Sequence, residues 1–99
     1  PGQADEAPLL AMIPVNVEPS KILELVREIR YTGVRVEIEL RSRKIGKAMG
    51  WADSIGAGYA LVVGPRDLEQ GQATVKRLAD GEQLPVALNT ESILSALNA

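Results

Sequence analysis

Four cationic side chains fall within one short segment of the chain, residues 41–47 (RSRKIGK). The segment lies where an alternating strand pattern gives way to a helical pattern, so we expect a strand end, a loop and a first helical turn. Guanidinium and ammonium groups beside exposed backbone N–H groups suit phosphate oxygens and the edges of nucleobases. A solvated cationic loop is the competing interpretation, and the residues alone leave both open.

Two pairs of carboxylates have a spacing that could serve acid–base chemistry, Glu37 with Glu39 and Asp67 with Glu69. In an extended strand Glu37 and Glu39 would project from one face, where one could donate a proton and the other accept one. Arginines flank this pair on the same face, so we expect a solvated, charge-balanced surface. The carboxylates therefore do not indicate a catalytic centre.

Several kinds of chemistry are excluded by residue types that the chain lacks. It contains no Cys and no His, which excludes thiol and imidazole nucleophiles, zinc fingers and a disulfide framework. The glycines at residues 56–58 precede a strand pattern, and residues 64–71 lack the Gly-Lys-Ser/Thr ending of a phosphate-binding loop. We therefore expect no catalytic residues, no metal site and no cofactor site in this chain.

These candidate groups must be positioned by alternating strands and helices. Apolar runs at residues 9–15 and 59–64 predict strands buried on both faces, whereas alternation at residues 34–41 predicts a strand with one wet face. Helical spacing of apolar residues predicts a helix that begins near Pro19, and a second helix that Ser42 would cap. In this second helix Ile45, Met49 and Ala52 are expected on one side.

The C-terminal third of the chain predicts a hairpin and a last helix. A turn at residues 64–67 is followed by strands at 73–78 and 83–88, and the final helix would be capped by Asn89. The element order is then β-α-β-α-β-β-β-α. Right-handed crossovers make the first three strands parallel and place helices on both faces, a three-layer α/β/α sandwich with the alternating strand at an edge.

Length and charge limit the possible partners. The chain has 99 residues, enough for one domain at 9–99 after a polar, frayed tail at 1–8, and without an initial Met it is expected to be part of a longer protein. No apolar run approaches a membrane span, and the absence of Cys suits the cytoplasm. Because the formal net charge is −2, any contact with nucleic acid must be local, and duplex DNA is not an expected partner.

The ordered motifs of residues 34–64 (VRVEIELRSRKIGKAMGWADSIGAGYALVVG) resemble the anticodon-binding domain of class II aminoacyl-tRNA synthetases, in the histidyl, threonyl, prolyl and glycyl group. The spacing of Gly71, of residues 73–76 and of residues 80–83 continues the resemblance, which covers residues 9 to 99. The Lys-x-Gly-Lys helix start and the Gly-Glu-Gln of the hairpin are most similar to the histidyl branch. The resemblance implies a mixed five-stranded sheet, order 2-1-3-4-5, with strand 4 antiparallel.

The resemblance also implies a function in which this domain binds the anticodon loop of tRNA(His). A separate domain of a homodimeric parent ligase would attach histidine with ATP and Mg²⁺. Three unstacked bases are recognised by local hydrogen bonds and stacking, which suits a chain without a basic surface. The family pattern places the tRNA-binding side chains at Asn16, Ser42, Arg43, Lys44, Lys47, Asp67, Lys76 and Gln83.

Structural interpretations compete with several of these assignments. Asn16 and Ser42 could simply cap helices, and Asp67, where the family more often has Glu, could cap a turn. Trp51 and Tyr59 could stack on bases, but both follow apolar patterns and are expected in the core. Two other functions also remain open. One is a regulatory module of a synthetase-like protein without aminoacylation activity, and the other is a protein-interaction or dimerisation module.

Overall fold

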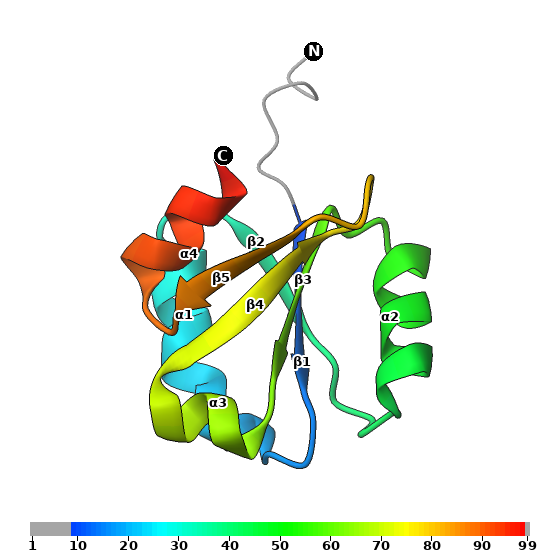
Figure 1. Cartoon of the computed structure of the whole chain (residues 1–99), viewed down its shortest axis with the longest axis horizontal. Helices are drawn as coiled ribbons and strands as arrows, with labels where there is room; N and C mark the ends of the chain where they lie inside the picture. The colour runs from blue at the N-terminus through cyan, green and yellow to red at the C-terminus, as the bar shows by residue number, and fades with distance from the viewer. Residues whose placement is uncertain (1–8, 99) are drawn as a thin grey trace.

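The strands form one mixed sheet in the order β2-β1-β3-β4-β5, in a computed structural model that describes residues 9–98 (Figure 1). β1 (Leu9–Pro14) pairs in parallel with β2 (Arg35–Ile38) and with β3 (Tyr59–Val63). β4 (Gln72–Arg77) is antiparallel to β3 and to β5 (Gln83–Ala87). The expected strand order and the edge position of β2 are confirmed. The tail predicted at residues 1–8 lies outside the described residues.

Helices cover both faces of the sheet and make three layers (Figure 1). α1 (Leu23–Tyr31), extended at its start by the 3-10 helix η2 (Pro19–Ile22), lies with α4 (Thr90–Leu97) on one face. α2 (Ile45–Ser54) lies on the other face and packs mainly against β1 and β3. This face of the sheet is therefore covered by α2 chiefly over β1 and β3, with β4 and β5 to one side of it.

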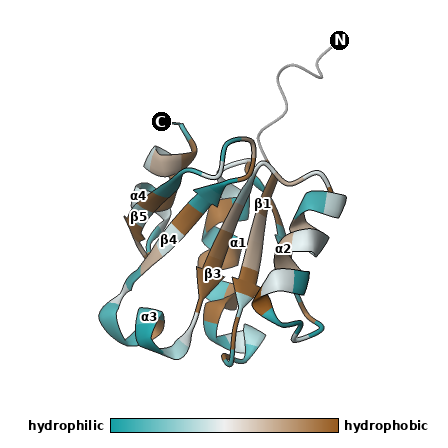
Figure 2. Cartoon of the chain, turned by 45° about the vertical axis from the view of Figure 1, so that its right-hand side comes forward, coloured by the Kyte–Doolittle hydropathy of each residue, from teal (hydrophilic) through white to brown (hydrophobic). Residues whose placement is uncertain are grey.

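The buried strands are apolar on both sides because each side contributes to a different half of the core (Figure 2). In β1, Leu10 and Met12 belong to the cluster beneath α1 and α4, whereas Leu9, Ala11 and Ile13 belong to the cluster beneath α2. The α2 cluster is completed by small side chains of the helix and the adjoining strand. They are Ala48, Ala52, Ala57 and Ala60.

One helix was not predicted from the sequence. Where residues 64–67 indicated a turn, α3 (Pro65–Gln70) begins with Gly64 at its N-cap and Pro65 in its first turn. The Asp67 carboxylate accepts a hydrogen bond of 2.7 Å from the Gly64 N–H, which closes this first turn. Gly, Pro and Asp favour a helix start as strongly as they favour a turn, so the residue types alone did not distinguish them.

The strand predicted at residues 34–41 ends at Ile38, and the side chains of Glu39 and Leu40 have the opposite of their expected environments. Glu39 is buried, with 2% of its surface exposed, whereas Leu40 is 66% exposed. The expectation that Glu39 lies on a solvated face is therefore wrong. The expected cap by Ser42 is also wrong, because α2 begins at Ile45 and Lys44 occupies the N-cap position. In place of strand pairing, backbone N–H groups of the following loop donate hydrogen bonds to the Glu39 carboxylate.

Gly50 lies inside α2 with open space where a Cβ would be, so it does not bring the helix closer to the sheet. We expect Gly50→Ala to raise the free energy of unfolding by about 0.5–1 kcal/mol, because alanine loses less conformational entropy in a helix. Gly56 follows α2 with φ of 79°, and Gly56→Ala should lower the free energy of unfolding by about 1 kcal/mol. Urea unfolding of both variants measures the two changes in unfolding free energy. Changes of the same sign in both variants would contradict this interpretation.

Candidate nucleic-acid interface

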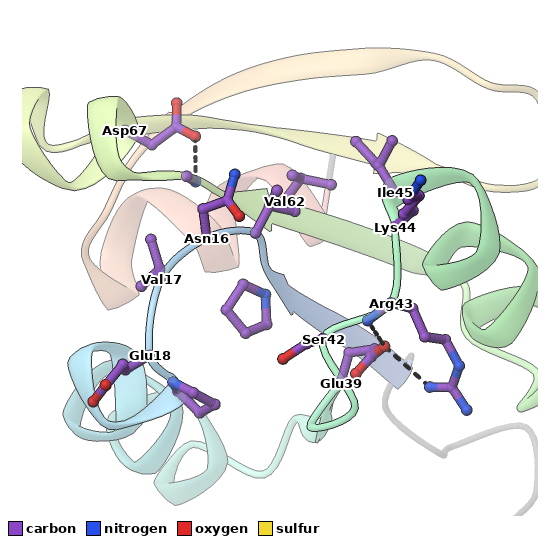
Figure 3. Close-up of a pocket in the computed structure, with 14 residues that line it drawn as sticks. Asn16, Val17, Glu18, Glu39, Ser42, Arg43, Lys44, Ile45, Val62 and Asp67 are labelled. Atoms are coloured by element: carbon purple, nitrogen blue, oxygen red, sulfur yellow. Dashed lines mark hydrogen bonds and ion pairs between the residues drawn. The ribbon is translucent and has the colours of Figure 1, made fainter.

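A hollow opens where the carboxyl ends of β1 and β3 meet the loop before α2 (Figure 3). Its volume is about 760 Å³, within the range of small-ligand clefts. Five of the side chains predicted from the sequence line it. They are Asn16, Ser42, Arg43, Lys44 and Asp67. The carboxyl ends of parallel strands are where open α/β sheets bind ligands, so the position of the hollow fits a binding site.

A second hollow, of about 320 Å³, lies over the sheet beside α2. Asp67, Lys76 and Gln83 line it, together with Thr74. Lys76 and Gln83 are brought together because β4 and β5 pair at this position of the hairpin. Side chains that line both hollows join them into one continuous surface, which we call the groove. These shared side chains are Ile45, Val62 and Asp67.

Seven of the eight predicted side chains therefore line the groove, and one does not. Lys47 is exposed on α2 but lines neither hollow. Asn16 has a positive φ of 56°, and no side-chain hydrogen bond caps η2, so its amide is not used as a helix cap. Asp67 uses Oδ2 for the Gly64 N–H and leaves Oδ1 without a hydrogen bond in the described part of the chain.

Glu39 organises the loop that forms one wall of the groove. Its Oε1 accepts a hydrogen bond from the Arg41 N–H, and its Oε2 accepts one of 3.0 Å from the Arg43 N–H. The Arg43 guanidinium forms an ion pair of 3.1 Å with the same carboxylate and lies over the Trp51 ring, 5.8 Å from its centroid. Ser42, between the two donors, has a left-handed φ of 55°.

The environment of Glu39 favours its charged form. Burial by itself would raise the pKa of the carboxyl, but the hydrogen bonds from the backbone of Arg41 and Arg43 and the guanidinium of Arg43 lower that pKa below its ordinary value. The buried negative charge is therefore compensated within the loop.

This lowered pKa predicts an acid-sensitive contribution to stability. A carboxyl with a depressed folded-state pKa stabilises the fold above its unfolded pKa, about 4.3 for Glu, and loses this contribution as pH falls through the folded value. Between about pH 5 and pH 2, the chain should lose more unfolding free energy than its Glu39→Gln variant does. Urea titrations at a series of pH values measure the difference. Parallel losses in the two proteins would contradict it.

Apolar groups of the groove were missed or misplaced by the sequence analysis. Ile45 was expected on one side of α2 together with Met49 and Ala52, but it is 51% exposed and lines both hollows. Met49, half-buried, lines the second hollow. The helical spacing of the apolar residues was correct, but the side chains that α2 turns toward the sheet are those of Ala48 and Ala52. The available signal in the sequence was that Ile45 lies one helical turn before the first of these two alanines.

The two candidate stacking aromatics, expected in the core, are half-buried and pack against its edges. Tyr59 packs against the cluster beneath α1 and α4, and its hydroxyl donates a hydrogen bond of 3.2 Å to the Leu97 carbonyl. Trp51 is half-buried, packs against the cluster beneath α2 and lies under the Arg43 guanidinium. Neither ring lines the groove.

Residues 9–98 contain no cluster of three carboxylate-type side chains that could hold a metal ion. In the same range, no helix combines the length and the apolar composition that a membrane span requires. The polar groups that line the groove are its cations, its amides and the carboxylates of Glu18, Glu39 and Asp67.

Comparison with known proteins gives one consistent result. The model of the family described as the anticodon binding domain matches residues 10–98. The histidine–tRNA ligase of Pyrococcus furiosus is 34% identical over 84 residues, which are 84% of this chain and 19% of that protein. That of Saccharopolyspora erythraea is 42% identical over 69 residues, 70% of this chain and 16% of the relative.

Solved structures share the fold over nearly the whole chain. The apo histidyl-tRNA synthetase of S. aureus superposes with a TM-score of 0.81 at 22% identity and covers 98% of this chain and 25% of that one. The prolyl-tRNA synthetase of Cryptosporidium parvum has a TM-score of 0.75 at 26% identity, over 90% of this chain and 20% of that one. The chain thus spans about a fifth of the length of the curated relatives it matches.

Proposed function

Because the chain belongs to the anticodon binding domain family, we propose that it binds the anticodon loop of tRNA(His) as one domain of a histidine–tRNA ligase. One observation carries the proposal. Seven side chains assigned to tRNA binding from the sequence, on five segments of the chain, line one groove that runs from the carboxyl ends of β1 and β3 over the sheet beside α2. The relatives named histidine–tRNA ligase support the choice of histidine among the synthetase branches.

The groove offers complementary groups to an unstacked base. The apolar side chains of Ile45 and Met49 provide a surface for the face of a base, and Lys76 and Gln83 stand beside it with donors for base edges. The Oδ1 atom of Asp67 is an acceptor for the N–H edge of guanine, which occurs twice in a histidine anticodon, GUG. Lys44, exposed at the start of α2, is placed for a phosphate.

The electrostatics of the chain suit a local contact. With a net charge of −2, the domain as a whole does not attract RNA, so its affinity must come from the groove. We expect weak binding by the isolated domain and a shallow dependence on salt, since few phosphates are neutralised. In a ligase, contacts to other parts of the same tRNA would add to this affinity through linkage.

The remaining parts of the proposal concern the longer protein. A separate catalytic domain would hold ATP and Mg²⁺ and attach histidine, since this chain matches only about a fifth of the length of its ligase relatives. We also propose a homodimeric parent located in the cytoplasm. The absence of cysteine is compatible with that compartment.

Fluorescence anisotropy with a labelled anticodon stem-loop tests the binding proposal. The matched control is a hairpin with the same stem and a short, tightly stacked loop. The proposal predicts saturable binding of the anticodon stem-loop and at least tenfold weaker binding of the control, because the groove needs unstacked bases. Equal affinity for the two RNAs would reduce the function to a non-specific contact, and no binding at millimolar RNA would overturn it.

A further inference from the structure

Glu39 is not among the side chains assigned to tRNA binding, yet its buried carboxylate contacts the loop that carries three of them. We propose that Glu39 is a positioning residue, which fixes residues 40–44 in the conformation that forms the groove. This inference rests on the proposed RNA-binding function. It assigns to Glu39 a role that its charge alone would not suggest, because a carboxylate beside an RNA site repels phosphates.

The hydrogen bonds of Glu39 use both of its oxygens. Oε1 accepts from the Arg41 N–H, while Oε2 accepts from the Arg43 N–H at 3.0 Å and from the Arg43 guanidinium at 3.1 Å. A carboxylate is acceptor-only and can hold all three donors at once. A glutamine of the same shape has one acceptor oxygen and turns its NH₂ toward the other donors. The site therefore distinguishes the two side chains by chemistry and not by size.

The loop conformation needs this support. Ser42, between the two bonded amides, has φ of 55°, a region that residues with a Cβ adopt infrequently and keep only when their surroundings hold them. The Glu39 N–H donates a hydrogen bond of 2.9 Å to the Met12 carbonyl, so the carboxylate projects from a residue fixed to the central sheet. The loop is thus tied to β1 through Glu39.

The same contacts change the role assigned to Arg43. Its guanidinium is paired with Glu39 and packed over Trp51, so most of its charge is compensated within the wall of the groove. Lys44 is exposed next to it and has no ion pair among residues 9–98. In this arrangement Arg43 shapes the groove, and Lys44 provides the accessible positive charge.

Positioning and electrostatics predict opposite effects of Glu39→Gln. Removing a negative charge near RNA should strengthen binding, whereas releasing the loop should weaken it. We expect the affinity for the anticodon stem-loop to fall about tenfold, as for the loss of one charge-assisted hydrogen bond. The control is Glu37→Gln, which removes the same charge from an exposed residue two positions earlier and should leave the affinity within twofold.

Two readouts on the full chain complete the test, the dissociation constant and hydrogen exchange at the Arg41 and Arg43 amides. Both amides should exchange faster in Glu39→Gln without RNA and be unchanged in Glu37→Gln. Glu39→Asp keeps the charge but shortens the side chain by one methylene, so its carboxylate cannot hold all three donors in the same geometry. Its affinity should fall between those of wild type and Glu39→Gln, and it replaces the glutamine variant if glutamine prevents folding.

The outcomes separate this inference from the binding proposal. Wild-type chain that binds no RNA overturns the proposed function. If the wild-type chain binds and Glu39→Gln has the same affinity as Glu37→Gln, the positioning role alone is overturned. If the glutamine variant does not fold, the same conclusion follows when Glu39→Asp has the affinity of wild type. Faster exchange at both amides together with weaker binding supports it.

Discussion

Replacing Lys76 by glutamate is expected to weaken binding of the anticodon stem-loop about thirtyfold, a loss of about 2 kcal/mol. Lys76 lies on β4 opposite Gln83 and lines the second hollow, and it has no ion-pair partner in the range 9–98. Its ammonium group is therefore available to a base edge or a phosphate. Glutamate removes that donor and places a negative charge where the RNA must approach. Fluorescence anisotropy at constant salt measures the change.

Arg27→Glu is the matched control for this charge reversal. Arg27 is exposed on α1, on the opposite side of the sheet, and its ion pair with Glu24 is a solvated one of little energetic value. The control alters the net charge by the same amount, so a general electrostatic effect would appear in both variants. Equal losses in the two would contradict the location of the interface, and the affinity of Arg27→Glu is expected to stay within threefold of wild type.

Truncation of Leu61 to alanine is expected to lower the free energy of unfolding by about 3 kcal/mol. Leu61 lies at the centre of β3, is fully buried, and packs in the cluster beneath α1 and α4. Removing its side chain leaves a cavity between β3 and the helices on that face, and the close-packed core around it has little freedom to collapse. A domain of this size has a total stability of about 5–15 kcal/mol, so the loss is a large fraction.

Leu40→Ala provides the comparison, because the sequence pattern alone would make the two leucines equivalent. Leu40 is 66% exposed, so its truncation should cost about 0.5 kcal/mol or less. Urea unfolding followed by circular dichroism measures both values. A large loss for Leu40→Ala would mean that the strand alternation continues to residue 40 and that Glu39 is not buried.

The strands and the layers were predictable from the sequence because strong periodicities specify them. The runs at residues 9–15 and 59–64 are apolar throughout and short, and a short apolar run bounded by Pro or Gly is typical of a strand covered on both faces. The hairpin followed from Asp80-Gly81 between two strand patterns, and β4 and β5 lie where expected. The antiparallel fourth strand came from the family resemblance and not from periodicity.

The segment from residue 38 to residue 45 was not predictable from the same patterns. Its conformation depends on one buried carboxylate that bonds two backbone amides, an arrangement set by tertiary structure and invisible to an alternation of apolar and charged residues. The sequence placed Glu39 among solvated charges because charged residues are rarely buried without a partner. Here the partner, Arg43, is four residues away, in a segment that had been assigned to RNA contacts.

The candidate site was likewise predictable in part from the sequence. Asn16 and Asp67 come together because they follow the carboxyl ends of the parallel strands β1 and β3. Lys76 lies farther along the sheet, paired with Ala60 near the start of β3, and lines the groove from the face of the sheet. Lys47 lies outside the groove because it stands on α2 two positions after Ile45, which lines the groove. Each residue along a helix turns the side-chain direction by about 100°, so Lys47 points to the other side of the helix.

The most direct test of the account is an amide chemical-shift titration of this chain with an anticodon stem-loop carrying GUG, compared with one whose anticodon is scrambled. We expect shifts gathered at Ser42, Lys44, Asp67 and Lys76 with the GUG loop and clearly weaker ones with the scrambled loop. Equal shifts with both loops would contradict readout of the histidine anticodon. Shifts confined to the exposed face of α1 would contradict the groove itself.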